Sequence, residues 1–195
     1  MFSRQFALML LFVLAFGSLI SAAHADAMED ANKAYYNREY DAAFDLFKPL
    51  AEQGNAEAQY RIGWMYIYGL GTYRSYPDAV DWLTKAANQG IPEAAHQLGQ
   101  MYDLGLGVEK NNLVAYMWYA VCKRQLTDLE QKPTSFNPQV DMDIMREVMT
   151  KEEVEEALRL AATWKRLTPD GKLAPPMPKK PKNDDQYPLP GKPQY

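Results

Sequence analysis

The chain contains one sequence pattern written twice between Gly54 and Cys122, with an offset of 36 residues. A period between about 20 and 50 residues is typical of proteins that stack small supersecondary units. The sequence therefore predicts a stack of repeated units. The matching pairs are Gly54/Gly90, Glu57/Glu93, Ala58/Ala94, Gly63/Gly99, Met65/Met101, Tyr66/Tyr102, Gly69/Gly105, Leu70/Leu106, Gly71/Gly107, Ala79/Ala115 and Trp82/Trp118.

Each copy has the periodicity of a helix. Ala58, Ile62 and Tyr66 recur at four-residue spacing, which places them on one face of a helix over residues 54–68. Gly63 lies inside this helix, where glycine costs about 1 kcal/mol relative to alanine. Because Gly99 repeats that cost in the second copy, we expect a neighbouring helix to pass too close at both positions for a side chain.

A glycine-rich turn and a second helix complete each copy. Gly69 and Gly71, with their counterparts 36 residues later, suit a helix end and a turn that requires positive φ. Pro77 fits the first turn of a helix over residues 77–89. The equivalent helix covers residues 111–124.

In this combination of residues, the chain resembles the Sel-1-like repeat family, a relative of the tetratricopeptide repeats. The resemblance implies a right-handed α-solenoid, all-α in class, that is used for protein interactions. It rests on residues 54–60, Ile62-Gly63, Met65-Tyr66, Gly69-Leu70-Gly71, Ala79, Trp82 and residues 85–90, and on their second-copy counterparts.

The flanking regions predict how the stack ends. Residues 26–53 form an atypical first helix pair, followed by repeats over 54–89 and 90–125. Residues 126–167 contain an irregular loop, a short helix near residues 140–149 and a C-terminal capping helix, which the capping box from Thr150 to Glu153 begins. Residues 168–195 contain eight of the 13 prolines, so we expect a disordered proline-rich tail.

Residues 1–25 have the pattern of a cleaved signal peptide. Arg4 precedes the apolar run from Phe6 to Ile20, and Ala23-His24-Ala25 suits signal peptidase. We expect cleavage before Asp26 and a periplasmic or secreted protein. The alternative, an uncleaved anchor, requires an apolar run longer than these 15 residues.

Composition excludes several classes of partner and site. Residues 26–195 carry 20 basic and 25 acidic side chains, a net charge of −5, which argues against nucleic acid. No second apolar run reaches membrane-spanning length, so we expect no membrane insertion after cleavage. We also expect the protein to be a monomer. Cys122 is the sole cysteine, so it cannot form an internal disulfide, and we expect it to be buried.

The sequence predicts no catalytic, metal or cofactor site. His96 is the only histidine after residue 25, and no nucleophile elbow, phosphate-binding glycine loop or Ser-x-x-Lys motif is present. Cysteine-rich relatives have been linked to β-lactam chemistry, but their paired cysteines are missing here.

The candidate binding site is the concave groove. Residues about 200° around the first helix of each repeat from its buried face point away from the stack. In the first repeat these are Tyr60, Trp64 and Tyr68; in the second they are His96, Gln100 and Leu104. The aromatic ladder can anchor a peptide or helix. Alternatively, the helix over residues 27–37 covers these rings.

Two functions remain open. The first is an exported adaptor that holds a protein or peptide partner in this groove and regulates or assembles an envelope complex. The alternative is a hydrolase or carbohydrate-binding protein that acts on cell-wall polymers or β-lactams.

Overall fold

The computed structural model describes residues 26–128 and 135–164, and every regular element within them is helical. The predicted signal peptide and proline-rich tail lie outside these residues. A helix over residues 26–36 comes first. It is followed by α2 (Tyr40–Glu52), α3 (Ala56–Tyr68), α4 (Tyr76–Asn88), α5 (Pro92–Leu104), α6 (Asn112–Asp128), α7 (Pro138–Arg146) and α8 (Lys151–Thr163).

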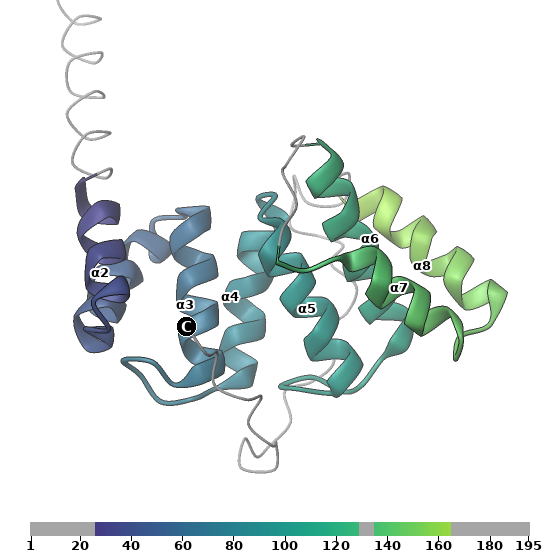
Figure 1. The fold of residues 1–195 in the computed structure, drawn as a ribbon, viewed down its shortest axis with the longest axis horizontal. Helices are drawn as coiled ribbons and strands as arrows, with labels where there is room; N and C mark the ends of the chain where they lie inside the picture. Colours follow the sequence, from purple (N-terminus) through teal and green to yellow (C-terminus); the bar gives the residue numbers. More distant parts are fainter. Residues whose placement is uncertain (1–25, 129–134, 165–195) are drawn as a thin grey trace, which may run out of the picture.

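The helices form antiparallel pairs stacked in a row, which confirms the predicted α-solenoid (Figure 1). α3 packs on α4 and α5 packs on α6, so each sequence repeat is one helix pair. Ala58, Ile62 and Tyr66 lie in the core between the helices, as their spacing predicts. No helix in the described ranges combines the length and apolarity needed to cross a membrane.

Local signals set the ends of the repeat helices. The Ala58 N–H donates a hydrogen bond to Asn55 Oδ1 at 2.9 Å and begins α3. Gly69 ends it in the left-handed conformation at φ 65°. Gly105 ends α5 in the same way at φ 71°. The two hairpins therefore have the same turn geometry, because glycine adopts positive φ without steric cost.

The helical glycines lie where helices pack most closely. A Cβ on Gly63 would lie 2.7 Å from Leu83 Cγ of α4. A Cβ on Gly99 would lie 2.6 Å from the Tyr119 ring of α6. The prediction that a neighbouring helix excludes a side chain at both positions is confirmed.

The glycine turn of each repeat also joins it to the unit before. A Cβ on Gly71 would overlap the Tyr40 carbonyl group at the start of α2. A Cβ on Gly107 would lie 2.5 Å from the Tyr76 carbonyl carbon at the start of α4. Each turn therefore packs backbone against backbone on the second helix of the preceding unit.

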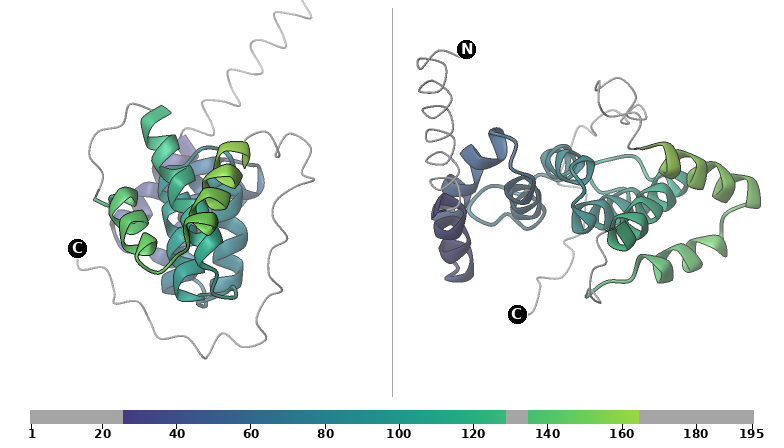
Figure 2. Two further views of the ribbon diagram at one scale, coloured as in Figure 1. Left: turned by 90° about the vertical axis from the view of Figure 1, so that its right-hand side faces the viewer. Right: turned by 90° about the horizontal axis from the view of Figure 1, so that it is seen from above.

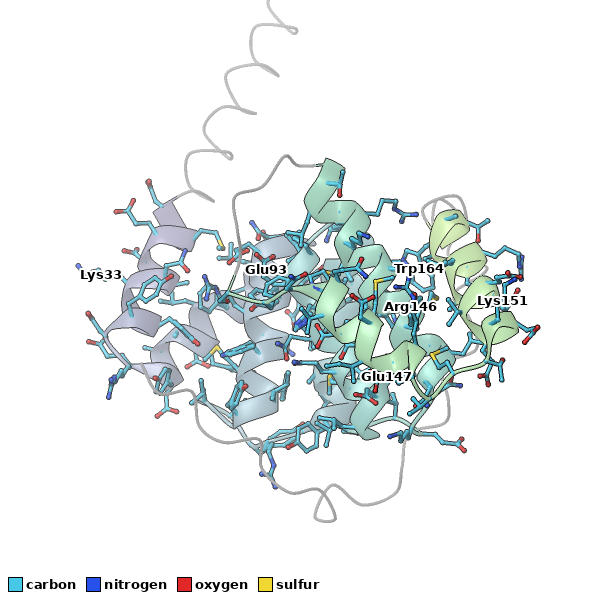
Figure 3. The ribbon with its side chains drawn as sticks, turned by 45° about the vertical axis from the view of Figure 1, so that its right-hand side comes forward. Lys33, Glu93, Arg146, Glu147, Lys151 and Trp164 are labelled. Carbon is cyan, nitrogen blue, oxygen red and sulfur yellow. The ribbon has the colours of Figure 1, made fainter. Side chains whose placement is uncertain are left out.

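The two ends of the stack are built differently. At one end, the helix over residues 26–36 buries Ala31 and Tyr35, while Lys33 points outward (Figure 3). At the other end α8 begins at the predicted Thr150 capping box and packs on α6. Trp164 contacts the Trp118 ring at 4.5 Å and donates a hydrogen bond to Asn88 Oδ1 at 2.7 Å. α8 thus caps the stack.

Candidate functional site: an aromatic groove

The aromatic ladder of α3 lies on the helix face opposite its core residues. The Tyr60 and Trp64 ring centroids are 6.2 Å apart, and those of Trp64 and Tyr68 are 4.7 Å apart. All three side chains are half-buried and pack against the core. Each ring therefore keeps part of its surface accessible.

A cavity of about 420 Å³ opens beside the ladder. The helix over residues 26–36 forms one wall of this cavity and does not fill it, so the rings keep an open side. Tyr36, on that wall, is 69% exposed. The lining residues are Tyr35, Tyr36, Arg38, Tyr40, Tyr60, Arg61, Trp64 and Ser135. We call this cavity together with the ladder the aromatic groove.

Arg61 is held in the wall by its neighbours. Its Nε donates to Glu57 Oε1 at 3.0 Å, so the carboxylate neutralises the guanidinium. The guanidinium also lies 5.4 Å from the Tyr35 ring centroid and 5.9 Å from that of Tyr60. Burial raises the pKa of the Tyr60 hydroxyl, which therefore stays protonated and can donate a hydrogen bond.

Arg38 supplies a second cation in a different setting. Among the described residues it is the only one other than glycine with positive φ, at 66°. A left-handed conformation costs a non-glycine residue about 1 to 2 kcal/mol. Its exposed side chain lines the groove, and within residues 26–128 and 135–164 it forms no ion pair.

The second repeat differs from the prediction at His96, which is buried and only 5% exposed. The Phe136 ring stacks on the imidazole at a centroid distance of 4.4 Å. His96 Nε2 lies in hydrogen-bond distance of Asp141 Oδ2, at 2.9 Å. Gln100 is half-buried and Leu104 is 63% exposed. His96 is thus not an open groove residue.

The chain itself covers that part of the groove. Residues 135–137 run past α5 and lead into α7, which packs on α6 (Figure 1). α7 and α8 lie on two different sides of α6 (Figure 2). Phe136 and Asp141 therefore cover the second repeat at His96, whereas the ladder of the first repeat keeps part of its surface accessible.

Sequence reasoning found two of the eight residues that line the cavity and missed the other six, Arg38 among them; it also missed Phe136 and Asp141, which cover His96. Phe136 is the sole aromatic residue of the excursion between α6 and α7, which was a usable signal. Asp141 lies five residues later on α7, whose start is marked by Asn137 as N-cap. Arg38 had no sequence signal, because its backbone conformation is visible only in the structure.

The described residues show no arrangement of reactive groups around the groove. Within them, no group of three or more His, Cys, Asp or Glu side chains is placed to hold a metal ion. Cys122 is fully buried, as predicted, and burial raises the pKa of its thiol to about 12. The groove offers rings, hydroxyl groups and cations, which suits binding.

Comparison with known proteins gives one family. A family model described as Sel1 repeat matches residues 30–55, 56–91 and 92–120. The chain is similar to the crystal structure of a protective antigen present in uropathogenic Escherichia coli strains, displaying an SLR fold, with 27% identity and a TM-score of 0.63. The similarity covers 74% of this chain and 31% of that one.

A Sel1 repeat protein from Oxalobacter formigenes is also similar, with 26% identity and a TM-score of 0.49 over 64% of this chain and 47% of that chain. The chain thus spans less than half the length of either protein. No curated protein matches.

Proposed function

The chain belongs to the Sel1 repeat family, and from this premise we propose that it is an exported scaffold that holds a segment of a partner protein in the aromatic groove. Sel1 repeats generally mediate protein–protein interactions. The partner segment lies along Tyr60, Trp64 and Tyr68, and by holding it the scaffold assembles or regulates an envelope complex.

One observation carries the proposal: Tyr60 and Trp64 of the first repeat line an open cavity of about 420 Å³, and Tyr68 continues the ladder beside Trp64. Tyrosine and tryptophan lose little conformational entropy on binding and dominate the energetics of many interfaces. Rings held rigidly by their neighbours, with one side accessible, are therefore suited to anchor a peptide or an exposed helix.

Export is the second component of the proposal. It is supported by the pattern of residues 1–25, in which a positive charge, an apolar run and a small-x-small site follow in order. We expect fractionation of the producing cells to recover a chain that begins at Asp26 outside the cytoplasm. Recovery of the uncleaved chain in the membrane would contradict this component.

The test of the groove is a photocrosslinking amino acid placed at position 64 in intact cells, followed by mass spectrometry of the crosslinked product. We expect one dominant partner. The double variant Trp64→Ala, Tyr68→Ala, with the crosslinker moved to position 60, should lose that product and keep a helical circular dichroism spectrum.

Leu104→Ala is the matched control, because Leu104 is the counterpart of Tyr68 in the second repeat and is 63% exposed. This variant should retain the crosslink. A crosslink that survives loss of both rings would show that the partner binds elsewhere. Binding or cleavage of purified peptidoglycan by the mature chain alone would favour the cell-wall alternative.

A further inference from the structure

The two repeats have equivalent positions on their first helices, one beside an open cavity and the other covered by side chains of the same protein. Tyr60 and His96 are 36 residues apart and occupy the same place on α3 and α5. At His96 the place is filled by the Phe136 ring at 4.4 Å and the Asp141 carboxylate at 2.9 Å. The second repeat thus shows what this surface accepts: a ring that stacks, and a carboxylate that follows it in sequence.

The aromatic groove at Tyr60 can likewise stack a ring and bind a carboxylate. Tyr36, Tyr60 and Trp64 present ring surface for stacking. Positive charge comes from Arg38, because the Arg61 guanidinium is paired with Glu57 at 3.0 Å. A carboxylate suits Arg38 best, since guanidinium binds it through two parallel hydrogen bonds.

The backbone at Arg38 gives a second, independent reason. Its φ of 66° favours glycine, yet the turn carries a long cationic side chain that lines the cavity. Strained residues concentrate at ligand sites, where the side chain has a use that offsets the strain.

We propose that the aromatic groove binds an acidic peptide segment of the partner, with one ring side chain stacked on Tyr60 and Trp64 and a nearby carboxylate held by Arg38. This inference rests on the proposed function and adds the chemistry of the partner. Because residues 26–195 carry a net charge of −5, a long polyanion is repelled, and a segment with one or two carboxylates fits better.

The probe is a fluorescein-labelled peptide that copies residues 134–142, because its Phe136 and Asp141 fit the equivalent surface. It is titrated with the whole mature chain at low salt, and its anisotropy is measured. We expect Arg38→Gly and Trp64→Ala each to weaken binding at least tenfold, while Arg38→Lys weakens it less.

Arg38→Gly separates binding from folding, because glycine accepts φ 66° and should leave the urea midpoint unchanged or higher. A second probe with Asp141→Asn should bind the unmodified chain as weakly as the first probe binds Arg38→Gly. The Asp141→Asn probe should bind Arg38→Gly with the same affinity as the first probe binds that variant. This non-additivity identifies the carboxylate and Arg38 as one contact.

Several outcomes would overturn the inference. One is equal binding of both probes by the unmodified chain, and another is binding that ignores Arg38→Gly and Trp64→Ala. Probe binding that appears only after Asp184→Asn and Asp185→Asn would identify the tail of the chain as the occupant. Dimerisation that competes with the probe would identify a second copy.

The cellular crosslink distinguishes this failure from failure of the proposed function. If the crosslink persists in Arg38→Gly and disappears in Trp64→Ala, Tyr68→Ala, the scaffold function stands and the acidic partner is wrong. If it persists in both variants, both proposals are wrong.

Discussion

At the scale of single residues, the turn glycines differ in what surrounds them. Gly71 and Gly54 both have positive φ, at 64° and 96°, but an added Cβ on Gly71 would overlap the Tyr40 backbone, whereas nothing lies within 4 Å of one on Gly54. We predict that Gly71→Ala lowers the free energy of unfolding by about 3 kcal/mol or more, and Gly54→Ala by about 1 kcal/mol.

Urea unfolding followed by circular dichroism measures both. Equal losses in the two variants would show that φ alone, and not the contact between units, makes glycine necessary at position 71.

Also at residue scale, the Cys122 thiol should be inert in the folded chain. Burial raises its pKa from 9.0 to about 12, so almost no thiolate is present at pH 8. We predict that Ellman's reagent labels Cys122 only as fast as the stack opens. Leu104→Cys in a Cys122→Ala background, at a position 63% exposed, should react rapidly.

The same raised pKa makes stability depend on pH. The unfolded thiol releases its proton near pH 9, while the folded thiol keeps it until about pH 12. The contribution of Cys122 is therefore fully present below pH 9 and decreases as pH rises from 9 to 12. Between pH 9 and 12, the free energy of unfolding of Cys122→Ala should decrease less than that of the unmodified chain. An identical decrease in both would contradict the raised pKa of the Cys122 thiol.

At the scale of elements, α7 packs on α6 through its buried face, and the contact of Asp141 with His96 also links it to α5. Asp141 bonds His96 on α5, whereas Asp143 pairs with Arg146 of its own helix on the surface. We predict that Asp141→Ala destabilises α7 by about 1 to 2 kcal/mol and that Asp143→Ala changes little. Amide hydrogen exchange should show faster exchange in α7 and unchanged α3 for Asp141→Ala; equal effects of both variants would contradict this.

The sequence predicts contacts between the repeated helices, but it does not predict contacts made across an aperiodic loop. Gly63 and Gly99 identified the close helix pairs, because a cost repeated at one period has one structural cause. The placement of α7 was not predictable, since residues 126–137 carry no period and the contact of Phe136 with His96 spans 40 residues of chain. Helix geometry identified Tyr60, Trp64 and Tyr68 as one face of α3. Whether the equivalent face of α5 is exposed depends on the contact of Phe136 with His96.

At the scale of the whole molecule, Trp164 ties the last helix to two units. Its ring packs on Trp118 of α6 and its indole N–H bonds Asn88 at the end of α4. We predict that Trp164→Ala lowers the free energy of unfolding by about 3 to 5 kcal/mol. Trp164→Phe keeps the ring and should lose about 1 kcal/mol for the hydrogen bond.

Thermal unfolding followed by circular dichroism distinguishes the two variants. Because each unit of a stack is stabilised by its neighbours, the loss should lower the melting temperature of the whole helical signal. A loss confined to α8 would show that the cap is an independent unit.

The segment over residues 135–137 has a consequence for valency. Under the proposed function the solenoid offers one open binding site, because Phe136 of its own chain occupies the equivalent position at His96. Duplicating residues 54–89 would add a repeat that carries its own Tyr60, Trp64 and Tyr68. The added repeat would have no segment like residues 135–137 to cover these rings. Under the proposed function, the lengthened protein should bind a second partner segment through the added ladder, but more weakly, because Arg38 lies outside the duplicated residues.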